Sequence, residues 1–580
     1  MLHSAPGAVC HSALGELRTG TQLDPLWRAL REEASRGAGG TQPLWSAFHR
    51  YEATGDRAPY EKPYFARRGR LNALAAVALA DRRPNAVADL ADMLWSVCDE
   101  HTWAVPAHAS LAAHVGRGIE QCLDLFACET GHALAEISAL LRDELPGPVT
   151  RRVREQVRRR VLAPFLGAGR PWPWESYTNN WSAVCAGSIG MAALALLDDG
   201  PELDEVLERC VRATDVFLSG LGTDGGCAEG IDYWAYGFGY FTYFAEALRE
   251  RTGRDLLREH PVAARAAAFP AHVALGDGTF VTFSDATPAP SLPTGLITRL
   301  RDRLGAPPPS GLTVPAFGAD RCHRWAHLSR TLAWTDAGVL GNSAPDGTAW
   351  LPDLGWIVDH RTAGGITVSF AAKGGHNDES HNHLDLGHFI LGAGGEQLLT
   401  DLGAGVYDAG YFGPDRYTAY PHPSAQGHSV PVVDGRCQRP GPDARAAVLH
   451  QSAGAEGAEL GLDLSAAYEG RGVRRYFAWS VGGSLTLTDT FEGASAVDEL
   501  FISPLAPRLG AGQAVWEGAA ATATLRFEAS SWQAEVERLD IRDHFGTGQT
   551  VHRLRLRSTG TPVTTAVFRF TLTPRRSGTR

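Results

Sequence analysis

The sequence lacks the features that would place it in several classes of protein. No stretch approaches the roughly 18 consecutive apolar residues that a membrane-spanning helix needs. The nine cysteines are scattered and form no Cys-x-x-Cys pair, so we expect neither a disulfide framework nor a zinc ribbon. The N-terminal segment shows no basic stretch followed by an apolar one. This predicts no signal peptide and, with the cysteine pattern, a cytoplasmic protein.

An excess of basic residues is also missing. Asp and Glu number 65 against 54 Lys and Arg, which gives a formal net charge of −11. Nucleic-acid-binding proteins normally carry a basic patch, so we expect no nucleic acid and no membrane as a partner. A polyanionic substrate remains compatible, because Arg, His or a metal ion can reverse the field inside a cleft. The oligomeric state is open, and a homodimer is compatible with the sequence.

The composition is that of a soluble globular protein, with 44% hydrophobic and 21% charged residues. A chain of 580 residues predicts two or three domains. Between about residues 25 and 300 apolar residues recur at helical spacing, as from Val87 to Val97. Prolines then accumulate, and beyond them apolar residues alternate with polar ones, as around Leu485. The predicted fold is multidomain α+β: an α/α toroid of helical hairpins at 1–315, a linker at about 288–320, and an antiparallel β-sandwich domain at 321–580.

The densest group of reactive side chains lies in the β half. His381 and His383 stand two residues apart, so on a strand both would point to the same face. Asp401 ends an apolar segment, and His428 follows. Two imidazoles and a carboxylate suit Zn²⁺ or Mn²⁺, with a position left for water or a substrate oxygen. A polar, hydrogen-bonded loop fits the spacing equally well.

A second group lies in the helical half. Asn179 and Asn180 precede an apolar helix, where asparagine is ordinarily a cap. The acidic turn Asp224–Gly230 leads into a helix on which Tyr233 and Tyr236 share a face. An aromatic stripe is more often part of a core, but phenols also suit sugar-binding clefts. Trp103 and His108 lie in a loop after another helix.

Three blocks in this order resemble the heparinase II/III-like polysaccharide lyases. The third is the most specific, and it continues into the segments around Asp401 and His428. The likeness covers about residues 60 to 440. The family's fold, an α/α toroid followed by antiparallel sheets, agrees with the change in hydrophobic pattern. The blocks are Asn179-Asn180-Trp181, Asp224-Gly225-Gly226-x-x-Glu229-Gly230 with its following tyrosines, and His381-Asn382-His383-Leu384-Asp385-Leu386-Gly387.

The resemblance implies a carbon–oxygen lyase that cleaves chains containing uronic acid. Such chains include hyaluronan, chondroitin, heparan sulfate and alginate, and β-elimination leaves a 4,5-unsaturated uronate. The C5 proton is poorly acidic while the neighbouring carboxylate is charged, so a group must neutralise that charge. By resemblance this group is Asn180, with Asn179 beside it.

The resemblance also implies the remaining catalytic groups and a metal. A base removes the C5 proton and an acid protonates the leaving O4. The family's catalytic tyrosine falls between Tyr233 and Tyr236, with a slight preference for Tyr236. His381 matches a histidine that polarises the carboxylate or acts as a second base. A divalent metal, Zn²⁺ or Mn²⁺, would fix the loop that bears His381. Its implied ligands are His383, Asp401 and His428.

Further substrate contacts are expected from Asn179, Trp103, His108, Glu229 and Arg416. Glu229 would orient a tyrosine or an arginine. Arg416 would bind a carboxylate or sulfate through bidentate hydrogen bonds, although a solvated loop arginine fits its position equally well.

Two other functions fit parts of the sequence. A glycoside hydrolase on an α/α toroid needs two carboxylates across the cleft, and Glu175 and Glu229 are the evident pair. A non-catalytic carbohydrate-binding homologue would keep the fold alone. The presence of Asn180, Tyr236 and His381 argues against that homologue, because a decayed site should have lost at least one of them.

Overall fold

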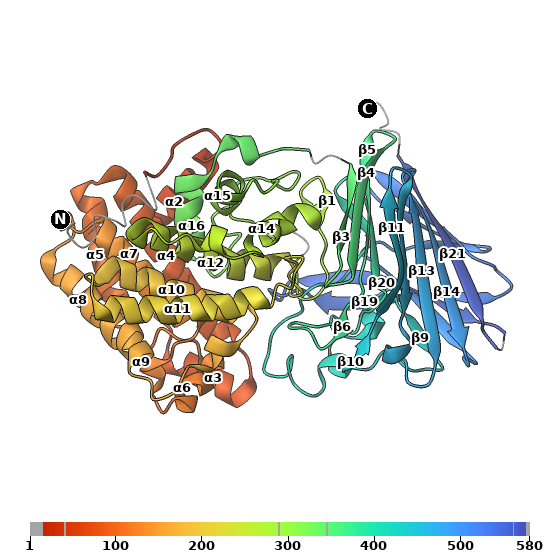
Figure 1. Cartoon of the computed structure of the whole chain (residues 1–580), viewed down its shortest axis with the longest axis horizontal. Helices are drawn as coiled ribbons and strands as arrows, with labels where there is room; N and C mark the ends of the chain where they lie inside the picture. The colour runs from red at the N-terminus through yellow and green to blue at the C-terminus, as the bar shows by residue number, and fades with distance from the viewer. Residues whose placement is uncertain (1–15, 40–41, 288–289, 344–345, 561, 576–580) are drawn as a thin grey trace.

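The computed structural model describes residues 16–39, 42–287, 290–343, 346–560 and 562–575. Helices occupy one end of an elongated molecule and β-sheets the other (Figure 1). The predicted order, a helical N-terminal domain followed by an antiparallel β domain, is confirmed. The N-terminal segment without a leader pattern (residues 1–15) and the start of the predicted linker (residues 288–289) lie outside the described residues.

The helical domain is built from helices that pack side by side. α10 contacts α7, α11 and α12, and α4 contacts α2 and α5. Within the described ranges, no helix is both long and apolar enough to cross a membrane. The α-helices are α2 Asp24–Ala34, α3 Trp45–Thr54, α4 Ala58–Asp81, α5 Pro84–Cys98, α6 Ser110–His114, α7 Leu125–Leu140, α8 Gly147–Val157, α9 Ala163–Leu166, α10 Asn180–Leu196, α11 Pro201–Ser219, α12 Ile231–Thr252, α13 Leu256–Glu259, α14 Ala263–His272, α15 Thr294–Leu304, α16 Trp325–Trp334 and, in the β half, α17 Arg416–Ala419.

Two helices show how the sequence pattern sets the packing. α5 begins at Pro84 and buries Val87, Leu90, Leu94 and Val97, the face that the spacing predicts. α10 is apolar around its whole circumference, and every residue except Trp181 is buried. A helix of that kind needs neighbours on all sides, which is why α10 lies inside the helical domain.

The β domain contains three larger antiparallel sheets of eight, four and five strands. Their strand orders are β11-β12-β13-β14-β21-β18-β17-β16, β19-β20-β15-β9 and β3-β4-β5-β7-β8. The strands are β3 Gly347–Leu351, β4 Trp356–Ala363, β5 Ile366–Ala372, β7 Phe389–Ala393, β8 Glu396–Leu399, β9 Pro431–Val433, β11 Ala447–Gly454, β12 Gly457–Asp463, β13 Gly472–Ser480, β14 Ser484–Glu492, β15 Val497–Ser503, β16 Arg508–Gly510, β17 Gln513–Glu517, β18 Ala521–Arg526, β19 Trp532–Arg542, β20 Gly548–Ser558 and β21 Thr565–Pro574. Two small pairs complete the set, β1 Ala274–Gly276 with β2 Thr279–Phe280, and β6 His376–Asn377 with β10 Gly441–Arg445.

The five-stranded sheet joins the two halves. Successive strand residues point to opposite faces: Val358 of β4 belongs to the core shared with the helices, whereas Ile357 belongs to the core between the sheets. The sheet therefore has a buried hydrophobic layer on each side. The helical half and the β half are packed together through this sheet.

The helical part extends beyond the predicted linker. α15 corresponds to the short helix expected there, but α16 follows and packs against α4, α7, α12 and α15. The predicted division at 315–321 thus falls between two helices that contact each other. β3, the first strand of the five-stranded sheet, begins at Gly347.

The β19–β20 hairpin reaches from the β half toward the helical domain (Figure 1). Its tip carries His544 and Phe545, and the guanidinium of Arg321 lies 4.0 Å from the centre of the Phe545 ring. A further contact joins the halves where the turn before β4 meets the α11–α12 loop: the Thr223 hydroxyl donates to Asp353 over 2.8 Å, and the Asp353 amide donates to Asp224 over 2.8 Å.

Candidate functional site

The loop at 381–383 brings both predicted histidines to a single carboxylate. These residues form no strand, so the expectation that they share a strand face is wrong, and His381 has a positive φ of 58°. The two rings nevertheless converge on Asp285. His381 Nδ1 lies 2.8 Å from Asp285 Oδ2, and His383 Nε2 lies 3.0 Å from Asp285 Oδ1.

Asp285 follows β2 in the helical half and is buried. Tyr407 and Tyr411 each donate a hydroxyl hydrogen bond to it over 2.8 Å. Burial alone would raise its pKa, but the hydrogen bonds from His381 and His383 hold the pKa of Asp285 well below its usual range. This carboxylate is therefore ionised and organises the loop around it.

A second chain of contacts joins Asn180 to His381 across the two halves. The backbone N–H of Asn180 donates to Glu229 Oε2 over 3.2 Å, and Glu229 Oε1 lies 3.5 Å from His381 Nε2. Asn180 Oδ1 is buried without a hydrogen-bond partner among the described residues. Burial raises the pKa of Glu229. Asn179 caps α10 by accepting a hydrogen bond from the Trp181 amide, so its side chain has the capping role.

The two candidate tyrosines have different surroundings. The Tyr233 ring stacks on His381 with centroids 4.1 Å apart, and its hydroxyl lies 2.9 Å from that of Tyr407. Tyr236 lies beneath the Arg324 guanidinium at 3.9 Å and packs edge-on against Tyr240. Burial raises the pKa of both phenols well above 10. The structure thus brings Tyr233, and not Tyr236, into contact with His381.

The remaining predicted contact residues are spread over several environments. Trp103 is fully buried and donates its indole N–H to the Val97 carbonyl over 3.0 Å, which makes it a core residue. His108 hydrogen-bonds Asp124 over 2.9 Å and packs edge-on against Trp181, beside Asn180.

Arg416 is buried, and so is not the solvated loop arginine that its position also allowed. Its contact with a substrate carboxylate or sulfate stays a prediction. Arg416 donates to the Asn382 carbonyl over 3.0 Å and to the Tyr411 carbonyl over 3.1 Å, with Asp285 Oδ2 at 3.4 Å. These bonds hold the histidine loop against the segment that bears the two tyrosines. Arg416 therefore acts on the shape of the site from behind it.

The predicted metal ligands form a compact, fully buried cluster. One ligand atom each from His383, Asp385, Asp401 and His428 lies within 4.8 Å of the others. His383 Nδ1 is 3.2 Å from His428 Nε2, which is 3.4 Å from Asp401 Oδ2. Both oxygens of Asp385 are already bound by Lys373 Nζ, at 2.7 and 2.8 Å.

The hydrogen-bond partners of the two imidazoles test whether a cation fits here. A carboxylate or carbonyl oxygen can only accept. His383 therefore carries its hydrogen on Nε2, toward Asp285, and His428 carries its hydrogen on Nδ1, toward the Ser424 carbonyl at 2.8 Å. Two nitrogen lone pairs then face each other beside Asp401 Oδ2, which has no hydrogen bond of normal geometry among the described residues. This donor set suits a divalent cation such as Zn²⁺ or Mn²⁺.

Arg475 of β13 supports this cluster from the sandwich. Its guanidinium donates to the Gly387 carbonyl over 2.9 Å and to the Ser429 carbonyl over 2.7 Å, next to His388 and His428. It is fully buried and paired with Asp489 and Glu499. The two loops that bear metal-site residues are thereby fixed to the sheet.

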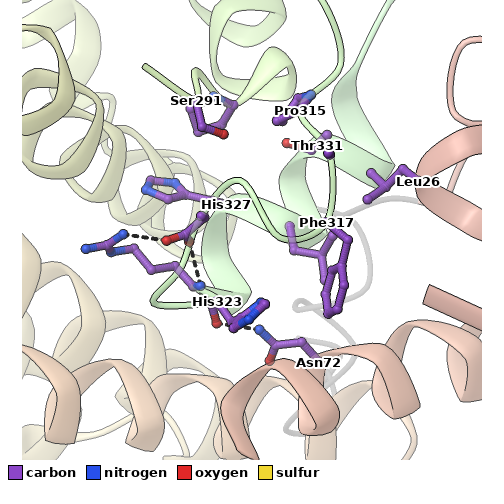
Figure 2. A pocket seen from close by; sticks show the side chains of 13 residues that line it. Leu26, Asn72, Ser291, Pro315, Phe317, His323, His327 and Thr331 are labelled. Carbon is purple, nitrogen blue, oxygen red and sulfur yellow. Dashed lines mark hydrogen bonds and ion pairs between the residues drawn. The ribbon is translucent and has the colours of Figure 1, made fainter. Parts of the chain in front are cut away.

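A separate pocket lies within the helical half, between α2, α4 and α16 (Figure 2). Its volume is about 440 Å³, including space open to solvent, and Asn72, Phe317, His323 and His327 are among the residues that line it. No sequence-predicted site residue is part of this lining. Arg324, which also lines it, is the residue that covers Tyr236, so the pocket lies beside Tyr236 and not beside Tyr233.

Sequence reasoning did not find Asp285, Tyr407, Tyr411 or Arg475. Asp285 lies near the predicted linker without a recognisable motif. An arginine in a β-strand is normally taken as exposed. The one available signal was the group of phenols between Asp401 and His428, two of which bind Asp285.

Comparisons with known proteins agree with this architecture. Residues 344–566 match the family model described as "Heparinase II/III-like, C-terminal". No curated protein matches the chain. The solved heparinase III BT4657 gene product is similar at a TM-score of 0.64 and 12% identity, covering 97% of this chain and 85% of that one. The heparan sulfate lyase HepC from Pedobacter heparinus is similar at 0.61 and 11%, with coverage of 97% and 85%.

At these identities the solved structures establish a shared fold, while the sequence match is to the family's C-terminal domain. The resemblance seen in the sequence motifs is confirmed by both. Residues 344–566 thus match the C-terminal domain of the heparinase II/III-like family, and nearly the whole chain shares the fold of solved heparinase III.

Proposed function

We propose that the protein is a polysaccharide lyase that cleaves chains containing uronic acid by β-elimination. The observation that carries this proposal is the stacking of Tyr233 on His381 where Glu229 links His381 to Asn180. An amide, an imidazole and a phenol supply the three tasks of the reaction. The three tasks are neutralisation of the carboxylate, removal of the C5 proton and protonation of O4.

The hydrogen bonds suggest which group does what. Because Asp285 accepts from His381 Nδ1, a neutral His381 has its lone pair on Nε2, 3.5 Å from Glu229 Oε1, and in this form it would act as the base. Tyr233 is assigned the acid because its ring stacks on His381 and its hydroxyl is at hand there. Burial raises the pKa of Tyr233, so its phenol holds its proton near neutral pH and would give it up only to a strongly basic acceptor such as the oxygen that leaves. The Asn180 side chain would donate to the uronate carboxylate and stabilise the enediolate that forms from it.

A divalent metal fits beside these groups. His383, Asp401 and His428 would hold it, and when bound it would supply a fixed positive charge that orders the loop between His381 and His383. The catalytic steps assigned above use the side chains of this chain only.

The test is an absorbance screen for the unsaturated product. Hyaluronan, chondroitin sulfate, heparan sulfate and alginate would be supplied as polymers and as short oligomers. We expect ultraviolet absorbance to rise with at least one of them, and not with Tyr233→Phe. New reducing ends without absorbance would instead indicate a hydrolase.

The hydrolase is disfavoured by the state of one of its two carboxylates. Glu175 is bound by Arg209 over 2.6 and 2.7 Å and accepts a hydrogen bond from the Trp172 amide over 2.6 Å. A carboxylate engaged in this way is a structural group. Glu229 would be left without a partner for hydrolysis.

A further inference from the structure

Asp285 is a carboxylate from the helical half that is inserted among side chains of the β half. Its two oxygens serve different neighbours. Oδ2 accepts from His381 and Tyr407, whereas Oδ1 accepts from His383 and Tyr411. One carboxylate therefore touches both the imidazole that stacks on Tyr233 and an imidazole of the metal cluster.

The two histidines are held in opposite tautomers by this single group. His381 carries its hydrogen on Nδ1, so in the neutral ring the lone pair is on Nε2, which lies 3.5 Å from Glu229 Oε1. His383 carries its hydrogen on Nε2, so Nδ1 is free on the side of His428 and Asp401. Each imidazole thus presents a lone pair where its own task requires one.

We propose that Asp285 is a positioning residue that couples the metal centre to the catalytic histidine. Its Oδ1 fixes His383 as a ligand and its Oδ2 fixes His381 as a base. The half of this inference that concerns His381 rests on the proposed lyase function. The half that concerns His383 does not, because metal affinity is measured without substrate.

An amide of the same shape separates this role from simple packing. Asparagine has one acceptor oxygen and one donor NH₂, so it cannot accept from both imidazoles. One histidine must then change its tautomer or lose its hydrogen bond. Where a carboxylate orients a catalytic imidazole, the amide variant can lose about 10⁴-fold in kcat although the geometry is kept.

The first measurement is the affinity of the full chain for Zn²⁺ alone, by competition with a chromophoric chelator. We expect Asp285→Asn to weaken Zn²⁺ binding about 10- to 100-fold. Tyr411→Phe is the matched control, because it removes one hydrogen bond to Oδ1 and keeps the carboxylate. Its affinity should stay within about threefold of the wild type. An Asp285→Asn affinity within the same range would overturn the proposal.

The second measurement is steady-state kinetics with Zn²⁺ at saturation. We expect Asp285→Asn to lower kcat by about 10²-fold or more, with KM within about threefold, because binding groups are untouched. Asp285→Glu, which keeps the charge, should recover part of both Zn²⁺ affinity and kcat. If Asp285→Asn fails to fold by circular dichroism, Asp285→Glu decides. A folded Asp285→Glu with displaced acceptor oxygens should lose part of both Zn²⁺ affinity and kcat, and wild-type values of both would refute the positioning role.

The two proposals fail separately. A wild-type protein that eliminates none of the uronate polymers refutes the lyase, while the Zn²⁺ titration still decides the role of Asp285 at His383. Weaker Zn²⁺ binding combined with an unchanged kcat would refute the coupling alone.

Discussion

Tyr233 and Tyr236 lie one turn apart on α12, yet they face different parts of the molecule. Tyr233 stacks on a β-domain imidazole and reaches Tyr407, whereas Tyr236 stays among helical residues beneath Arg324. Both phenols have raised pKa values, although Tyr236 is buried and Tyr233 is partly exposed. Neither residue type nor helix position distinguishes them. The difference arises from the β-domain loop that covers only the first turn of the helix.

The largest expected effect separates the two tyrosines directly. Tyr233→Phe removes the proposed acid and should lower kcat by about 10²- to 10⁴-fold. Tyr236→Phe should stay within about fivefold, because its hydroxyl touches no proposed catalytic group. Initial rates of absorbance increase measure both. If Tyr236→Phe is the inactive variant, the acid belongs to the Arg324 side of α12.

The metal cluster lies next to the loop that contacts Tyr233, and not next to Tyr236. His383→Ala removes a ligand and the imidazole that links the cluster to Asp285, so we expect loss of bound metal and about 10- to 100-fold lower activity. Elemental analysis of the purified protein measures the metal. His450→Ala, at an exposed histidine of β11, is the control and should keep the wild-type content. Equal metal content in both variants would show that His383 is not a metal ligand.

A substitution of Arg475 tests how much its buried contacts with the loops that bear Gly387 and Ser429 contribute to stability. Arg475→Met leaves Asp489 and Glu499 buried without their cation, so we expect a loss of about 3–5 kcal/mol in the free energy of unfolding. The neighbouring Arg474 is partly exposed, and Arg474→Met should leave the free energy of unfolding close to that of the wild type. Denaturant unfolding measures both. Similar free energies of unfolding for the two variants would show that the buried ion cluster around Arg475 contributes little to stability.

The smallest effect concerns the Tyr236 side, where Glu129 lies. Burial raises the pKa of Glu129 to about 7. Between the unfolded value of about 4.3 and that value, the folded protein keeps a proton that the unfolded chain has released. Stability from this group is therefore greatest at low pH and is lost as the pH rises toward 7, by at most about 4 kcal/mol. Glu129→Gln stays neutral, so its free energy of unfolding, measured by denaturant unfolding at several pH values, should change less than that of the wild type as the pH rises toward 7. The exposed Glu155→Gln should keep the pH dependence of the wild type.

Much of the fold follows from local pattern. The helical face of α5 and the alternation in β14, β20 and β21 are visible in the sequence because each depends on neighbours along the chain. The extent of the helical domain is not, because α16 follows a proline-rich segment and is helical through its packing against α4, α7 and α12.

The candidate site was predictable only in part, for a related reason. The ligand set around His383 and the group around Asn180 belong to short motifs that sequence can show. Asp285 is brought to His381 by the packing of the two halves, over a separation that no spacing rule covers. The choice between Tyr233 and Tyr236 likewise depends on which turn of α12 the loop at 381–383 covers.

The contact between Asp353 and the α11–α12 loop has a consequence for motion. Together with the Asp285 contacts it fastens the helical and β halves at two places far apart in the chain. Because contacts hold the two halves together at both places, we expect no wide hinge opening between the helical half and the β half during turnover. We therefore expect the distance between Asn180 and His381 to stay nearly constant during turnover, so that the proposed lyase would accept only uronate chains that fit this preset arrangement.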